Sequence, residues 1–217
     1  MNSGIVNLES IRALTATDTT FEGLTGRSPL HKQLSKLSSE VVTDVAQQQG
    51  IYLWGRYERN NLWTNIYFGK AGFGKTAHLQ ARLLEELRDE RTFSYLDVDL
   101  NTEHLENRKN EILTHCQKVS NPRMWPQYKN NINRHMHKAG ATHIAWVSTP
   151  MFNNSEVREL ESDLIESLNP TANMMRPAPP IADSMQTNTK NVFHELRARI
   201  HQSRPHKLVK AKRVVID

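Results

Sequence analysis

The feature that most constrains the fold is a pair of apolar runs at residues 51–54 and 62–68, with the polar stretch 58–61 between them. Both runs are rich in aromatic and β-branched residues. Two short runs of this kind, joined by a polar turn, predict a β-hairpin whose strands are antiparallel. An antiparallel pair at this point argues against a doubly wound parallel sheet and favours an α+β fold.

The apolar pattern after the hairpin predicts a β-β-α-β-α order. We expect a helix from Thr76 to about Arg88, a strand over 142–147, and a helix that Ser155 caps and that runs to Leu168. The predicted fold class is therefore a small α+β core with a three-stranded antiparallel sheet flanked by helices. Helical extensions are expected at the N-terminus, in the centre and at the C-terminus.

Changes in composition mark the boundaries of this core. Prolines at 170, 177, 179 and 180 indicate a linker. Helices are expected at 31–48 and at about 192–201, and residues 1–30 should form an arm or short helices. The expected parts are an N-terminal arm and helix at 1–48, a core at 49–174 with an insertion at about 101–140, and a linker with a basic extension at 175–217.

The positive charge of the chain is concentrated at one end. The net charge is +5, yet residues 186–217 alone hold eight basic and two acidic residues. A basic block of this kind attracts polyanions, above all nucleic acid. The single Cys116 argues against a disulfide framework, and no apolar segment follows Met1. We therefore expect a cytoplasmic protein that has no membrane contact and whose partner is double-stranded DNA.

Two tripeptides lie within the predicted hairpin, Gly-Ile-Tyr at 50–52 and Tyr-Phe-Gly at 67–69. The pair resembles the GIY-YIG nuclease family, with Phe68 in place of the usual Ile or Val. Members of that family carry an essential arginine on the helix after the second tripeptide, and Arg82 matches it.

The resemblance continues in the last predicted helix of the core. The family has a metal-binding glutamate there, followed by a proline and an asparagine. Glu161, Pro170 and Asn173 match these three positions. The resemblance covers about residues 49–90 and 142–174.

The position of Glu161 can be examined without the family. With Val157 at zero on a helical wheel, Glu161 lies at about 40°, between Leu168 at about 20° and Ile165 at about 80°. A carboxylate among core-facing side chains is costly unless it is paired or bound to metal. A buried ion pair of purely structural purpose is the alternative interpretation. Arg82 has no such support, since the polar face of its helix explains an arginine equally well.

The resemblance implies hydrolysis of a phosphodiester bond in DNA with one Mg²⁺ or Mn²⁺ bound at Glu161. An oxygen ligand that leaves several waters on the ion suits these metals. Arg82 would neutralise the phosphate. Tyr52 and Tyr67 would orient or deprotonate the attacking water, and a tyrosine base needs its pKa lowered from about 10 by nearby cations. Asn173 would close the site.

The chain departs from the family pattern around Arg82. The gap between Gly69 and Arg82 is longer than in most members, and the extra residues include Lys75 and His78. One turn beyond Arg82, where many members have His or Tyr, the chain has Glu86. We expect His78 or Lys75 to replace the missing group, an arrangement that resembles the restriction-endonuclease branch of the family.

The candidate DNA contacts are basic side chains of the glycine turn, the central insertion and the C-terminal extension. They would let the enzyme act as a homodimer or on nicked strands. Phosphate and base contacts are expected from Lys70, Arg123, Lys129, Arg134, Lys138, Arg197, Lys207 and Lys210.

Three other functions stay open. Residues 69–76 fit the phosphate-binding pattern G-x-x-x-x-G-K-[ST], which would make the chain a P-loop NTPase. That interpretation requires a mostly parallel sheet, whereas the strand before the turn is predicted to lie in a hairpin. A homing-type nuclease is less favoured than restriction or phage defence, because the arms show no zinc finger or helix-turn-helix. A non-catalytic DNA-binding protein is the third alternative.

Overall fold

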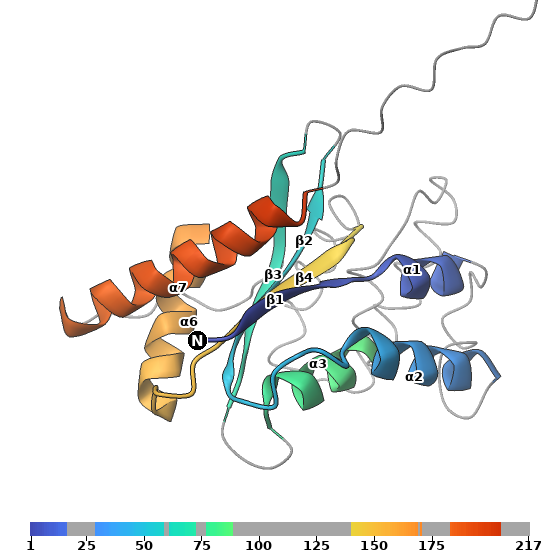
Figure 1. Cartoon of the computed structure of the whole chain (residues 1–217), viewed down its shortest axis with the longest axis horizontal. Helices are drawn as coiled ribbons and strands as arrows, with labels where there is room; N and C mark the ends of the chain where they lie inside the picture. Colours follow the sequence, from blue (N-terminus) through green and yellow to red (C-terminus); the bar gives the residue numbers. More distant parts are fainter. Residues whose placement is uncertain are drawn as a thin grey trace, which may run out of the picture.

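The computed structural model has a four-stranded antiparallel sheet at its centre (Figure 1). The strands are β1 (Ser3–Asn7), β2 (Gly50–Tyr57), β3 (Trp63–Ala71) and β4 (His143–Ser148), in the order β1-β4-β2-β3. The predicted hairpin is confirmed as β2 and β3. The residues that the structure describes are 1–16, 29–58, 61–72, 77–88, 140–168, 170 and 183–204.

The prediction of a three-stranded sheet is wrong, because the sheet has a fourth strand. Residues 3–7 were expected to belong to an arm or short helices, but they form β1, which pairs with β4 from Ser3 opposite Val147 to Asn7 opposite His143. The physical reason is that a strand of five residues draws its hydrogen bonds from a partner about 140 residues away. Local sequence carries little of that signal.

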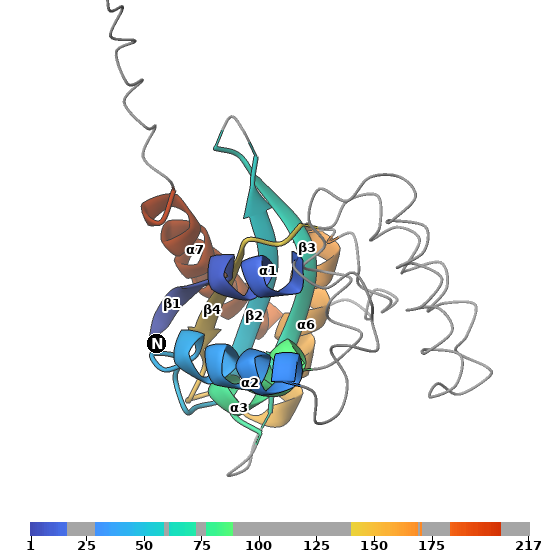
Figure 2. The same cartoon turned by 90° about the vertical axis from the view of Figure 1, so that its right-hand side faces the viewer.

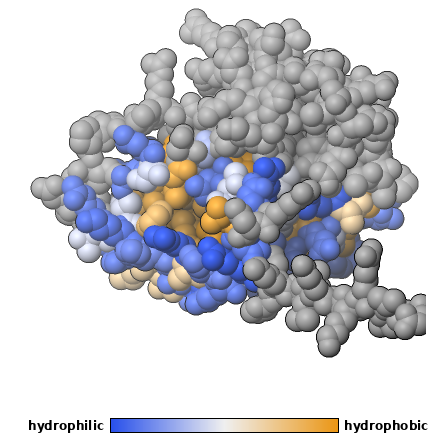
Figure 3. All heavy atoms as spheres, turned by 90° about the horizontal axis from the view of Figure 1, so that it is seen from above, coloured by the Kyte–Doolittle hydropathy of each residue, from blue (hydrophilic) through white to orange (hydrophobic). Residues whose placement is uncertain are grey.

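Helices cover both faces of the sheet (Figures 1 and 2). One face packs against α1 (Glu9–Ala16), α2 (Pro29–Val41) and α3 (Leu79–Arg88), and the other against α6 (Asn154–Leu168) and α7 (Asp183–Gln202). The two apolar clusters are therefore separated by the sheet itself. Figure 3 looks down on the molecule and shows hydrophobic side chains in a strip bordered by hydrophilic ones.

Several predicted boundaries change. Helix α2 ends at Val41 and not near residue 48, because Val42 and Val45 reach the core from a non-helical turn. Helix α7 begins at residue 183, about nine residues before its apolar pattern starts. Residues 101–139 of the predicted central insertion lie outside the described residues.

The cap of α6 is Asn153 and not Ser155. The Asn153 side chain accepts hydrogen bonds from the backbone N–H groups of Ser155 (2.9 Å) and Glu156 (3.0 Å). In return, Glu156 accepts one from the Asn153 backbone at 2.7 Å. This reciprocal arrangement is a capping box, which fixes the start of the helix that carries Glu161.

The two tripeptide glycines are explained by close packing. A Cβ on Gly69 would lie 2.8 Å from Tyr52 Cε2 and closer still to the Tyr52 hydroxyl. A Cβ on Gly50 would lie 2.7 Å from Leu79 Cδ1 and closer to the Val147 carbonyl oxygen. Each glycine thus lets a neighbour approach the sheet backbone, and in the case of Gly69 this neighbour is a candidate site residue.

Across the described ranges, we find no helix that is both long and apolar enough to cross a membrane.

Candidate active site at the edge strand

Three aromatic side chains of the hairpin share the face of the sheet that α3 covers. Residues directly opposite each other in an antiparallel pair point to the same side. Tyr52 lies opposite Gly69 and Trp54 lies opposite Tyr67, so Tyr52, Trp54 and Tyr67 all point toward α3. The rings of Tyr52 and Tyr67 are 6.3 Å apart between centroids.

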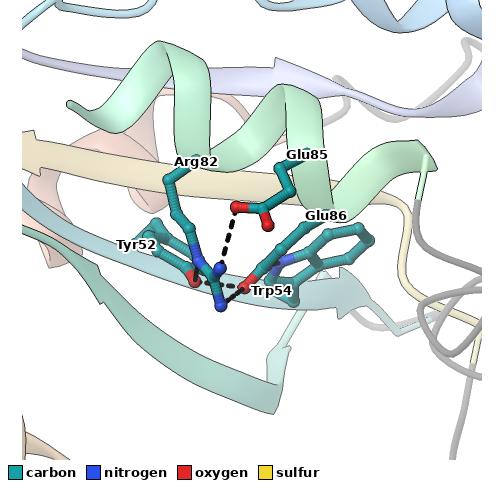
Figure 4. Close-up of polar contacts among 5 residues, drawn as sticks. All are labelled: Tyr52, Trp54, Arg82, Glu85 and Glu86. Carbon is teal, nitrogen blue, oxygen red and sulfur yellow. Dashed lines mark hydrogen bonds and ion pairs between the residues drawn. The ribbon is translucent and has the colours of Figure 1, made fainter. Parts of the chain in front are cut away.

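A buried carboxylate of α3 lies over these rings. Glu86 is only 7% exposed, and it accepts a hydrogen bond from the Tyr52 hydroxyl and another from Trp54 Nε1 at 3.2 Å (Figure 4). A carboxylate that accepts two side-chain donors in the core is well satisfied as an anion. Its oxygens are therefore held in a fixed place beside Tyr52.

Arg82 joins the same cluster from one turn earlier in α3. Its Nη2 lies 3.1 Å from Glu86 Oε1, its Nη1 lies 3.0 Å from Glu85 Oε2, and its Nε lies 3.4 Å from the Tyr52 hydroxyl. Burial alone would lower the pKa of Arg82, but Tyr52, Glu86 and Glu85 raise it above its usual value. The guanidinium is therefore a permanent cation at the mouth of the cluster.

The surroundings raise the pKa of both tyrosines. Burial raises the pKa of Tyr52 most, and the negative charge of Glu86 raises it further. Burial and Glu86 also raise the pKa of Tyr67, although Arg82 and a hydrogen bond with Tyr52 lower it in part. The expected lowering by nearby cations is therefore wrong in this structure, because burial and Glu86 outweigh Arg82. Both side chains remain neutral phenols at neutral pH.

A second carboxylate lies on the opposite face of the sheet. Lys70 is opposite Ile51, and so it points toward α6. Its Nζ lies 2.6 Å from Glu161 Oε2. The predicted burial of Glu161 is confirmed, because the residue is 7% exposed among Val157, Leu160 and Leu164.

Glu86 and Glu161 lie on opposite faces of the sheet, whose edge strand β3 carries both Tyr67 and Lys70. The charges of both Glu86 and Glu161 act on the Tyr67 hydroxyl and raise its pKa. Figure 2 shows α6 alongside β3, with α3 close to the same strand. The electrostatic field at Tyr67 therefore has contributions from both faces of the sheet.

Glu161 is the carboxylate at which the sequence predicted a metal ion. Its Oε2 accepts a hydrogen bond from Lys70. The cation of Lys70 already lies against this carboxylate, where a metal ion would also be attracted. Within the described ranges, no three His, Cys, Asp or Glu side chains converge at one place.

The remaining predicted site residues fall into two groups. His78 lies at the start of α3, where its Nδ1 accepts a hydrogen bond from the Ala81 backbone at 3.2 Å, and Arg197 lies exposed on α7. Outside the described residues are Lys75, Asn173, Arg123, Lys129, Arg134, Lys138, Lys207 and Lys210.

Sequence reasoning missed Glu86 and Trp54 as members of the cluster. Glu86 was noted only as a departure from the family, yet a signal for its burial exists. The buried positions of α3 are 79, 83, 86 and 87, which is the spacing of one helix face. A helical wheel of the kind applied to Glu161 would have placed Glu86 among the leucines.

The fold and the site together define an α+β protein in which a polar cluster lies between α3 and the β2–β3 hairpin of a four-stranded antiparallel sheet. The chain matches no family model, and neither a curated protein nor a solved structure is significantly similar to it.

Proposed function

We propose that this protein is a metal-dependent endonuclease that hydrolyses phosphodiester bonds in double-stranded DNA at the β3 edge. The proposal retains the resemblance to the GIY-YIG family and assigns the protein to cytoplasmic restriction or phage defence. A homodimer would place two such edges on one duplex.

The observation that carries the proposal is the buried cluster in which Tyr52, with Tyr67 beside it, bonds to Glu86. Arg82 pairs with the same carboxylate, while Glu161 lies on the α6 face of the sheet. Hydrolysis of a phosphodiester needs a water-activating group and a metal-binding carboxylate, and the hairpin carries one candidate for each on its two faces. An ion-pair network that served stability alone would not need two phenols beside Glu86.

The tyrosines would act as a proton relay and not as pre-ionised bases. The attacking water gives a proton to the Tyr67 oxygen, the Tyr67 proton moves to Tyr52, and the Tyr52 proton moves to Glu86. Each phenol regains the proton that it loses, so the relay needs no phenolate at rest. Glu86 ends as a neutral acid, and the water becomes hydroxide.

Arg82 and Glu161 would handle the substrate's charge. Once Glu86 accepts a proton, its ion pair with Arg82 weakens, which frees the guanidinium to bind the phosphate with its planar fork. Glu161 would hold Mg²⁺ or Mn²⁺, which supplies charge stabilisation at the phosphate and at the leaving 3′ oxygen. Lys70, a residue of β3, balances the charge of Glu161 in the metal-free protein and would contact a phosphate once a metal ion took its place.

The alternatives have less support. The strand that precedes the glycine turn is an antiparallel edge strand, whereas a P-loop follows a strand of a mostly parallel sheet. A non-catalytic DNA-binding protein would have no need for the buried network of Glu86, Tyr52 and Arg82. A homing-type nuclease is expected to carry a separate module that reads DNA, and no described element forms one.

Plasmid digestion without added nucleotide separates these functions. The proposal predicts linear or nicked plasmid with Mg²⁺ or Mn²⁺ and none with EDTA. ATP turnover without cutting would favour the P-loop interpretation. Salt-dependent DNA binding, with no cleavage in the presence of any divalent metal, would favour a non-catalytic DNA-binding protein. Sequencing of the ends would show whether cutting occurs at fixed sites, as restriction requires.

A further inference from the structure

A cavity of about 220 Å³ lies on the α6 side of the sheet, apart from the candidate active site. It is formed by the start of β3, the end of α6 and the second half of α7. Most of its wall is apolar, with Leu53, Leu168, Leu196 and Ile200 around the aromatic rings of Trp63 and Phe193. It is smaller than the roughly 300–1,000 Å³ of sites for drug-sized ligands, so it suits one planar ring system.

The aromatic wall is held in place by its neighbours. Tyr57 packs edge-on against Trp63, with 5.0 Å between ring centroids. The Tyr57 hydroxyl donates a hydrogen bond to the Ile200 carbonyl at 2.6 Å, which ties the hairpin to α7. A rigid aromatic wall loses little conformational entropy when a ligand stacks on it.

The mouth of the cavity is basic. Arg197, His201 and Arg204 contribute to its lining, and none of the lining residues is acidic. Arg204 Nη2 lies 3.3 Å from His201 Nε2, and Arg197 forms no ion pair with another described residue. Glu195, an acidic residue on the same helix, is engaged by Arg199 at 3.3 Å and by Ser3. The positive charge at the mouth is therefore not balanced within the described part of the chain.

Helix α6 borders the cavity and also carries Glu161. Leu168, in its wall, follows Glu161 by seven residues of α6, which is about 10 Å along a helix. At about 3.4 Å per nucleotide step, this corresponds to roughly three nucleotides of a DNA strand. A strand held at Glu161 can therefore reach the cavity.

We infer that this cavity binds one nucleotide, with its base against Trp63 and Phe193 and its phosphate at Arg197 and Arg204. The inference rests on the proposed function in that DNA is the expected source, although a free nucleoside monophosphate has the same chemistry. Aromatic stacking tolerates any base, and arginines bind phosphate through their forked donors. In a duplex, the base must first leave the stack, which is easiest at an unpaired position.

The test compares two labelled short duplexes that differ at one bulged position. One carries an unpaired nucleotide and the other an abasic residue, and both are titrated by fluorescence anisotropy in EDTA. We expect the intact bulge to bind at least about fivefold more tightly. Equal affinities would overturn the inference. A separate titration with free deoxyadenosine monophosphate distinguishes the two sources: saturable binding there shows that the cavity also accepts the free nucleotide.

Variants locate the effect on the protein. Arg197→Ala should weaken binding of the bulged duplex about fivefold. It should also reduce, by about one, the slope with which the logarithm of the affinity falls against the logarithm of the salt concentration. Lys190→Ala is the control, since Lys190 is exposed on the same helix but does not line the cavity. Equal effects of the two substitutions would contradict the inference. Phe193→Leu should reduce the preference for the intact bulge while thermal unfolding shows a folded protein.

The outcome is independent of cleavage because no metal is present. A protein that prefers the intact bulge but never cuts DNA would support the cavity and contradict the nuclease. Cleavage without such a preference would support the nuclease and contradict nucleotide binding in the cavity.

Discussion

The ammonium group of Lys70 lies 2.6 Å from Glu161 Oε2, so each of these two residues is the charge partner of the other across the β3–α6 contact. Glu161 is buried, and Lys70 is partly exposed. An ion pair of this kind offsets part of the cost of burying a carboxylate.

Lys70→Met should make the stability of the protein depend on metal. The substitution leaves Glu161 without its partner, and we expect a loss of about 2 kcal/mol in the free energy of unfolding without metal. Mg²⁺ should then raise the melting temperature of the variant more than that of the wild type. The matched control is Lys36→Met, which removes an exposed i,i+4 pair with Glu40 and should change stability little. An equal rise in melting temperature with Mg²⁺ in Lys70→Met and Lys36→Met would contradict a metal site at Glu161.

Glu86→Gln tests the proton relay. The substitution keeps the shape of the side chain but removes its ability to take a proton, so cleavage should slow by about a hundredfold or more. Glu85→Gln is the control, because Glu85 also pairs with Arg82 but is largely exposed and does not touch Tyr52. We expect its rate to stay within about twofold of the wild type. Unchanged cleavage by Glu86→Gln in a single-turnover assay would rule out the relay.

Gly69→Ala tests whether the second tripeptide is needed for packing at Tyr52. A methyl group there would lie against the Tyr52 ring, and overpacking of this kind costs about 1–3 kcal/mol. Urea unfolding should show this loss, and cleavage should fall because Tyr52 moves away from Glu86. Gly72→Ala is the control, since its nearest neighbour would be Asn154 Oδ1 at an ordinary 3.7 Å. Equal stability of the two variants would contradict the packing explanation.

His143 should make the fold sensitive to acid. Burial, together with the smaller effect of the Arg12 charge, lowers its pKa to about 4. The unfolded chain therefore binds a proton near pH 6.5, where the folded chain does not. The contribution of His143 to the free energy of unfolding should be fully present above pH 6.5 and should be lost as the pH drops toward 4. We expect this loss to be about 2 kcal/mol after allowance for the partial exposure of the side chain. His143→Phe should flatten this part of the curve in thermal unfolding, and an unchanged slope would contradict the assignment.

The sequence predicted the parts of this structure whose signals are local. The hairpin follows from two aromatic runs around a polar turn, and the burial of Glu161 follows from one helical wheel. Strand β1 was missed because its stability comes from pairing with β4 and from no pattern within five residues. The end of α2 and the start of α7 were misplaced because the apolar pattern does not coincide with the helix at either point. Val42 and Val45 continue the pattern beyond α2, and α7 begins about nine residues before its pattern starts.

The site was predicted less completely than the fold. Tyr52, Tyr67 and Arg82 do come together, but the direction of the tyrosine pKa shifts was wrong because burial cannot be judged from a single strand. The role expected of His78 stays a prediction; its Nδ1 accepts a hydrogen bond from the Ala81 backbone in the first turn of α3. Glu86 was overlooked because a charged residue on an amphipathic helix is usually solvent-facing.

Cleavage of plasmid DNA by Glu161→Gln tests the central claim most directly. The substitution keeps the size of the side chain and its hydrogen-bonding capacity toward Lys70, but it removes the anionic oxygen that would bind metal. We predict that the wild type cuts with Mg²⁺, whereas the variant binds the same DNA with unchanged salt dependence and does not cut. Mg²⁺-dependent cleavage by the variant at the wild-type rate would contradict the account.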